Sequence, residues 1–170
     1  MKAAAIVFAG TMLVAAGASA QVTDPQIAKI VVTANQVDID AGKLAAAKAT
    51  NAEVKKFAQT MVTDHTGVNK QAVALVTKLK VTPADNDTAK SLYDGGVKNV
   101  TNLKGLKGRE FDKAYIDNEV AYHTAVIDAV DKVLIPGAQN AELKALLVSV
   151  RPAFVAHLDH AKMIQSSLSK

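Results

Sequence analysis

Cysteine and tryptophan do not occur anywhere in the 170 residues. The absence of cysteine excludes disulfides, thiolate metal ligands, cysteine nucleophiles and the lipid-modified cysteine of a lipoprotein. Aromatic residues make up 4% of the chain, and its lysines and arginines are dispersed. Because a nucleic-acid interface needs a basic face and often stacking rings, no nucleic-acid partner is indicated.

The sequence also lacks the short motifs that mark familiar catalytic sites. It contains no G-x-S-x-G elbow, no phosphate-cradling glycine loop, no dinucleotide fingerprint and no H-E-x-x-H. Nothing places its serine, histidine and aspartate residues as a triad. No catalytic residue is therefore assigned, and a non-enzyme is favoured over an enzyme.

The first twenty residues have the pattern of a secretory signal peptide. Lys2 precedes an apolar run, and the run ends in the small-x-small site A-S-A before Gln21. We expect cleavage after Ala20 and export to the periplasm, leaving one domain over residues 21–170 without a membrane span. An uncleaved anchor is the less favoured alternative, because the apolar run is shorter than a membrane span.

Apolar residues in the rest of the chain recur at steps of three and four, which is typical of α-helices. This spacing and the capping residues predict four long helices, over residues 25–49, 51–80, 108–134 and 140–168. The link within each successive pair is short, so each pair should fold as an antiparallel hairpin. The glycine-containing segment 81–108 should cross the bundle as a connection, with short helices at 87–92 and 97–103.

Histidines interrupt the apolar seams of two of these helices. The second helix has the seam Val54, Ala58, Met61, His65, Val68, Ala72, Leu75 and Leu79. His157 holds the same position in the seam of the fourth helix, where Pro152 predicts a kink. A buried imidazole without partners would cost roughly 1–3 kcal/mol, so these histidines need hydrogen bonds or a metal.

The other two helices offer polar residues at the same level. Glu119 and His123, four residues apart on the third helix, can point at one object. Asp38 lies beside the first-helix seam, which is formed by Ile27, Ile30, Ala34, Val37, Ala41, Leu44 and Lys48. All these polar residues lie within about three residues of their helix midpoints, roughly 5 Å along the axes.

Packing of the four helices should therefore bring three imidazoles and several carboxylates into one core layer. The predicted metal ligands are Asp38, His65, Glu119, His123 and His157, a donor set that suits one zinc, iron, copper or nickel ion. Supporting positions around them are Asp64, Asp112 and Tyr115. A self-satisfied polar layer without metal is the alternative.

Three segments resemble a bacterial envelope family called domain of unknown function 4142: DIDAGKLAAAKATNAEVKKFAQTMVTDH, FDKAYIDNEVAYH and RPAFVAHLDHAKMI. The resemblance covers nearly the whole mature chain. It implies a ferritin-like four-helix fold and does not imply a biochemical role. The motif positions that it marks are Asp64, His65, Phe111, Asp112, Tyr115, His123, Pro152 and His157.

The chain departs from a di-iron ferritin-like site. Such a site needs Glu-x-x-His on two helices, whereas Val62 and Phe154 stand three residues before His65 and His157. A mononuclear, histidine-rich site fits better than ferroxidase chemistry.

The leading hypothesis is thus a periplasmic, ferritin-like helical protein that holds a transition metal or serves as an envelope stress accessory. A metal-dependent oxidase and a purely structural or interaction module are the alternatives. An envelope protein partner and a homo-oligomer both stay open.

Overall fold

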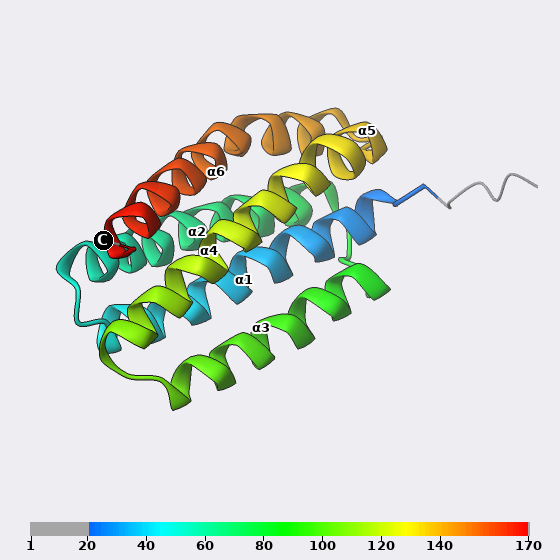
Figure 1. Ribbon diagram of the computed structural model, residues 1–170. Helices are drawn as coiled ribbons and strands as arrows, with labels where there is room; N and C mark the ends of the chain where they lie inside the picture. The colour runs from blue at the N-terminus through cyan, green and yellow to red at the C-terminus, as the bar shows by residue number, and fades with distance from the viewer. Residues whose placement is uncertain (1–20, 170) are drawn as a thin grey trace, which may run out of the picture.

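The computed structural model describes residues 21–169, and every regular element within them is helical. This range contains five long helices (Figure 1): α1 Asp24–Lys48, α2 Ala52–Leu79, α3 Asp87–Gly105, α4 Gly108–Ala129 and α6 Ala141–Leu168. A π-helical turn, η1 Val130–Leu134, and a short helix, α5 Ile135–Gly137, continue α4. The all-α prediction is confirmed for these residues, whereas the predicted signal peptide, residues 1–20, lies outside them.

Asparagine side chains cap the N-termini of α2 and α6, the two helices that follow short links. The Asn51 side chain accepts hydrogen bonds from the first backbone N–H groups of α2, and Asn140 does the same for α6. Thr23 is the N-cap of α1, and the next residue, Asp24, has a different role. Its carboxylate accepts the backbone N–H groups of Gln139 and Asn140 at 2.8 and 2.9 Å, so it ties the start of α1 to the start of α6.

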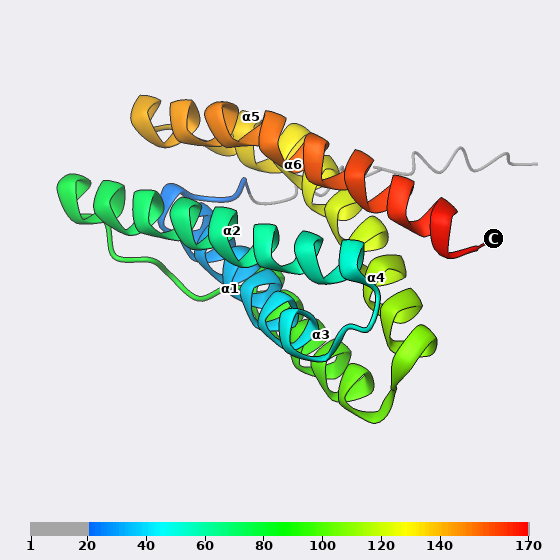
Figure 2. The same cartoon turned by 90° about the vertical axis from the view of Figure 1, so that its left-hand side faces the viewer.

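Four of the five long helices pair as two hairpins, α1 with α2 and α4 with α6. Figure 1 shows α1 beside α2 and α4 beside α6, and Figure 2 shows the two pairs from the side. Close approach of α1 and α2 explains the glycine inside α1. A methyl group at Gly42 would lie 3.0 Å from Val62 Cγ2 and 3.1 Å from the Ala58 carbonyl oxygen.

The connection between the hairpins differs from its prediction. Residues 87–105 form one continuous helix, α3, instead of two short helical pieces, and α3 packs along α1 (Figure 1). The Gly95-Gly96 pair does not break this helix because Gly96 is buried against α1. A Cβ atom at position 96 would lie 2.7 Å from both Val37 methyl groups, so glycine allows the two helices to touch.

Packing of α3 on α1 also changes which face of α1 is buried in the bundle. The predicted seam places Asp38 beside the core, but Asp38 is 1% exposed and Asn35 is 3% exposed. Val37, predicted to lie in the seam, is half-buried and contacts α3. A helix covered on two sides buries a wider stripe than a single seam of steps of three and four describes.

The end of the second hairpin contains the π-helical turn. The third helix is predicted to end at residue 134, whereas helical structure continues through η1 and α5 to Gly137. Val130 and Leu134 of η1 are buried. Single π-turns inside helices are uncommon and are frequent at functional sites.

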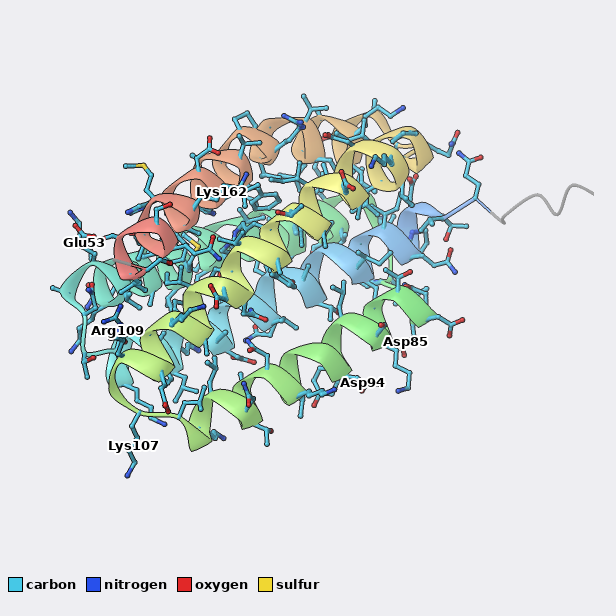
Figure 3. All side chains as sticks on the ribbon, in the orientation of Figure 1. Glu53, Asp85, Asp94, Lys107, Arg109 and Lys162 are labelled. Atoms are coloured by element: carbon cyan, nitrogen blue, oxygen red, sulfur yellow. The ribbon has the colours of Figure 1, made fainter. Side chains whose placement is uncertain are left out.

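Charged side chains cover the outside of the helices. Figure 3 shows Glu53, Lys107 and Lys162 pointing away from the ribbon, and all three are exposed. Among the helices of residues 21–169, none combines the length and apolar character that a membrane crossing requires.

Candidate metal centre

The five predicted ligand residues meet in one layer of the core. Asp38 of α1, His65 of α2, Glu119 and His123 of α4 and His157 of α6 are all at most 6% exposed. The three imidazole rings form a nearly equilateral triangle: centroid distances are 5.6 Å for His65 to His123, 5.3 Å for His65 to His157 and 5.4 Å for His123 to His157. The prediction that four helices contribute to one layer therefore agrees with the geometry.

The orientation of His65 is fixed by Asn35. The Asn35 amide nitrogen donates to the Val31 carbonyl at 2.8 Å, which leaves its amide oxygen facing His65 Nδ1 at 2.7 Å. An amide oxygen can only accept, so Nδ1 of His65 carries the proton. In the neutral ring Nε2 then has a free lone pair.

His123 and His157 are held in the same manner. His123 Nδ1 lies 3.1 Å from the Glu119 carbonyl oxygen, and His157 Nε2 lies 2.9 Å from Asp64 Oδ2. Both partners are acceptors, so these nitrogens are the protonated ones. The lone pairs of the neutral rings are therefore on His123 Nε2 and His157 Nδ1.

The remaining ring nitrogens are buried and lack hydrogen-bond partners among the described residues. They are His65 Nε2, His123 Nε2 and His157 Nδ1. Both carboxylate oxygens of Asp38 are also buried without a hydrogen-bond partner among these residues. Asp38 Oδ2 lies 3.0 Å from His65 Nε2 and 3.5 Å from His123 Nε2, without hydrogen-bond geometry to either. When the three rings are neutral, three lone pairs and a carboxylate come together at one point.

Burial favours the neutral form of two of the imidazoles, those of His123 and His157. It lowers the pKa of His123 to about 4, which the Asp38 carboxylate counteracts only in part. Burial also lowers the pKa of His157, against the opposing hydrogen bond to Asp64. Neutral imidazole is the form that binds metal ions.

The two carboxyl groups of the layer are shifted in opposite directions. Burial and the neighbouring Asp38 raise the pKa of Glu119 well above its usual range. Burial acts in the same direction on Asp38, but the close contact with His65 and the positive charge that His65, His123 and His157 carry when protonated outweigh it, and the pKa of Asp38 is lowered. Asp38 is therefore the ionised carboxylate of the layer.

One ring nitrogen from each histidine lies within 4.8 Å of the other two, and Asp38, Glu119 and His123 form a second such group. Tetrahedral zinc with Zn–N bonds of about 2.0–2.1 Å would need spacings of about 3.3 Å between ligand atoms. The two Asp38 distances, 3.0 and 3.5 Å, already match this spacing.

The predicted supporting residues divide into two that reach the layer and one that does not. Asp64 orients His157, as described. Tyr115 is buried beside the layer, where burial and the carboxylates of Glu119 and Asp38 raise its pKa well above the usual value. The prediction for Asp112 needs correction: its carboxylate accepts from Thr50 N, Thr50 Oγ1 and Asn51 N, in the link between α1 and α2.

Sequence reasoning missed Asn35. The available signal was its position between Val31 and Asp38, at spacings of four and three on one face of α1. The predicted seam one residue away obscured this spacing.

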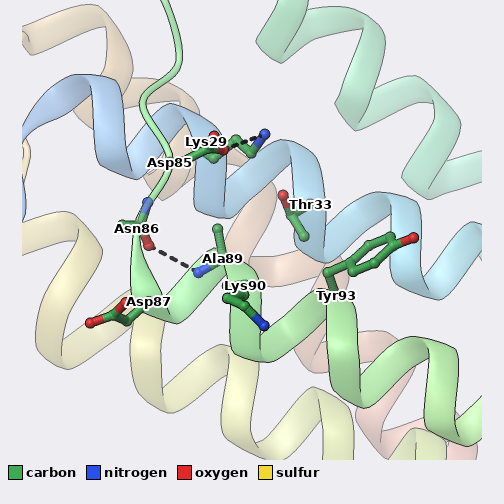
Figure 4. A pocket seen from close by; sticks show the side chains of 8 residues that line it. All are labelled: Lys29, Thr33, Asp85, Asn86, Asp87, Ala89, Lys90 and Tyr93. Carbon is green, nitrogen blue, oxygen red and sulfur yellow. Dashed lines mark hydrogen bonds and ion pairs between the residues drawn. The ribbon is translucent and has the colours of Figure 1, made fainter.

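A hollow of about 540 Å³ lies between α1 and the start of α3 (Figure 4). Its polar side chains form a surface ion pair and cap a helix. Lys29 Nζ pairs with Asp85 Oδ1 at 2.8 Å, and Asn86 Oδ1 accepts a hydrogen bond from Ala89 N at the start of α3, at 2.9 Å. These contacts explain the polar residues as capping and surface pairing.

Comparison with known proteins identifies the family of the chain. Searches of curated proteins and of solved structures gave no significant match. A family model described as "Domain of unknown function (DUF4142)" matches residues 9–164, nearly the whole length. The chain therefore belongs to the DUF4142 family.

Proposed function

We propose that this protein binds one divalent first-row transition metal ion through Asp38, His65, His123 and His157. The observation that carries the proposal is the set of buried ring nitrogens and carboxylate oxygens without hydrogen-bond partners among the described residues. Leaving a buried polar atom unpaired costs about 1–3 kcal/mol, and this layer concentrates several such atoms at one point. A cation at that point would satisfy all of them together.

The outer hydrogen bonds of the three histidines support the same proposal. Each ring donates its far N–H to a fixed oxygen: Asn35 Oδ1, the Glu119 carbonyl or Asp64 Oδ2. Metal-binding histidines almost always have such a partner, because it sets the ring tautomer and orientation. A self-satisfied polar layer would instead direct these hydrogen bonds toward one another.

Charge and ligand type favour a divalent ion of the zinc, iron, copper or nickel class. Three neutral imidazoles and one or two carboxylates are borderline ligands without a soft sulfur donor. Asp38 and Glu119 together would carry two negative charges once Glu119 ionises, which a divalent cation would balance in this buried layer.

We further propose that α1, α2, α4 and α6 form a ferritin-like core to which α3 is added, and that the protein is exported to the periplasm. The two hairpins support the first statement, and the sequence of residues 1–20 supports the second. Val62 and Phe154 occupy the positions where a di-iron centre would need glutamates, so a mononuclear binding role is favoured over oxidase chemistry.

The test is metal analysis of the mature protein purified from the periplasm, followed by titration of the stripped protein with zinc, copper, nickel and ferrous iron. We expect one ion per chain and a raised melting temperature for wild type. The triple variant His65→Ala, His123→Ala, His157→Ala should bind none. His160→Ala is the matched control, because His160 is an exposed histidine on α6. A wild-type protein whose melting temperature no metal changes would refute the proposal.

A further inference from the structure

An apolar cavity of about 190 Å³ lies beside the histidine layer. Ile30 and Val31 of α1, Ala129 and Val130 at the α4–η1 junction, and Leu147 and Phe154 of α6 supply much of its wall. Asn35 and His65 also line it, so the cavity and the histidine layer share a side chain.

The side-chain polar groups of Asn35 and Tyr122 at this cavity are already hydrogen-bonded. Asn35 uses its amide nitrogen on Val31 and its oxygen on His65, and the Tyr122 hydroxyl donates to the Ala34 carbonyl at 2.8 Å. The inner wall is otherwise aliphatic or aromatic, and Thr88 stands at the exposed rim. Because a bound water needs two to four polar partners, this interior suits an apolar occupant better than water.

A path from the surface reaches the cavity between α3 and the second hairpin. The lining residues Thr88 of α3, Ala125 of α4 and Val133 of η1 are exposed, whereas Leu147 and Val130 are buried. The cavity wall between the exposed and the buried lining residues includes η1, the single π-helical turn in residues 21–169. Such turns often mark functional sites, so both the opening and the backbone irregularity are on one side of the cavity.

The floor of the cavity is a stacked pair of rings. Phe154 lies nearly parallel to His65, with 7° between the ring planes and 5.4 Å between centroids. Both rings line the cavity, and His65 directs Nε2 toward Asp38 Oδ2 at 3.0 Å, so an occupant would contact the apolar part of the two rings.

We propose that this cavity binds a small neutral hydrocarbon group, an aromatic ring or a short alkyl group. A dry engineered cavity of about 150 Å³ is known to take up benzene, so this volume accepts a molecule of about that size. The site stands on its own lining residues and does not depend on metal in the neighbouring layer.

Toluene and phenol provide a matched pair of probes, because they have nearly the same shape and phenol carries a hydroxyl group where toluene carries a methyl group. Titration of the mature protein should give a saturable rise in melting temperature with toluene, together with shifts of the Val130 and Leu147 methyl signals in NMR. Phenol should bind at least about tenfold more weakly, since its hydroxyl would be buried without a partner.

Ala129→Leu should fill the cavity and remove the toluene response. Ala121→Leu is the matched control, because Ala121 is an exposed alanine on the same helix and does not line the cavity. Leu147→Ala, which enlarges the cavity, should bind toluene or larger hydrocarbons, and it provides a second test if Ala129→Leu does not fold. His123→Ala should still bind toluene, which separates this site from the metal proposal.

The absence of a saturable response up to the solubility of toluene would overturn the proposal. Equal affinity for phenol would overturn the assigned ligand class. A toluene response that survives in folded Ala129→Leu would place binding elsewhere and overturn it as well.

Discussion

Asn35 Oδ1 lies 2.7 Å from His65 Nδ1 and holds that ring with its Nε2 lone pair toward the other two histidines. Outer partners of metal-binding histidines are typically worth 10–100-fold in metal affinity. We therefore expect Asn35→Ala to weaken zinc binding by about that factor, measured by competition with a chromophoric chelator.

Gln36→Ala is the control for this variant, because Gln36 is the adjacent exposed residue and bonds only to Asp40 among the described residues. It should leave zinc affinity unchanged. Equal affinities for wild type and folded Asn35→Ala would show that Asn35 does not orient a metal ligand.

Apolar replacement of the layer distinguishes a metal site from a structural polar network. The variant Asn35→Leu, Asp38→Leu, His65→Leu, His123→Leu, His157→Leu removes buried polar groups that lack partners among residues 21–169, together with Asn35, whose amide oxygen would lose its partner His65. Replacing buried charged groups with apolar residues of similar volume is often stabilising by about 1–4 kcal/mol. Urea unfolding in the presence of EDTA should show a gain of that order over metal-free wild type. A large loss of stability would instead indicate a self-satisfied network.

The acid response of the metal-free protein follows from the pKa of His123. Its folded value is about 4, below the ordinary 6.5, so the unfolded chain takes up this proton first as pH falls. The stability of the folded state is therefore lost between pH 6.5 and pH 4, by on the order of 3 kcal/mol. The lowered pKa of His157, caused by burial, acts in the same direction.

Glu119 opposes this trend, because its pKa is raised in the folded protein and folding is weakened as pH rises above 4.5. Glu119→Gln removes that contribution and keeps a neutral side chain in place. Urea unfolding with EDTA across pH 4 to 6.5 should give a steeper rise in stability for Glu119→Gln than for wild type. Identical slopes would contradict the assignment of a proton to Glu119.

The adjacent glycines of α3 should respond oppositely to alanine. A Cβ atom at Gly95 has no neighbour within 4 Å among the described residues, so Gly95→Ala should stabilise the protein by about 0.5–1 kcal/mol. Gly96→Ala should destabilise it by about 1–3 kcal/mol, because the new methyl group meets Val37. Thermal unfolding measures both, and adding Val37→Ala to Gly96→Ala should recover part of the loss. Equal effects at the two positions would mean that α3 does not pack on α1 as described.

Much of the fold could be predicted because it depends on local signals. Asn51 and Asn140 start α2 and α6 as their positions suggest, and the short links require antiparallel hairpins. The predicted seam of α2 is buried from Val54 to Ala72, with His65 within it. The residues of the histidine layer could be found for the same reason: each is a polar residue near the middle of its helix.

What could not be predicted depends on contacts between distant segments. α3 is a full helix because Gly96 fits against Val37, and a glycine pair alone is usually a signal for a break. The roles of Asn35 and Asp112 depend on the rotation of α1 and on the link at residues 50–51. Neither is visible in the spacing of a single helix.

The histidine layer draws on both hairpins, so it can form only after α4 and α6 have docked on α1 and α2. Contacts between such distant parts of a chain tend to form late in folding. Interactions absent from the folding transition state act mainly on the unfolding rate. An ion held in this layer would therefore extend the lifetime of the folded protein and leave its folding rate nearly unchanged.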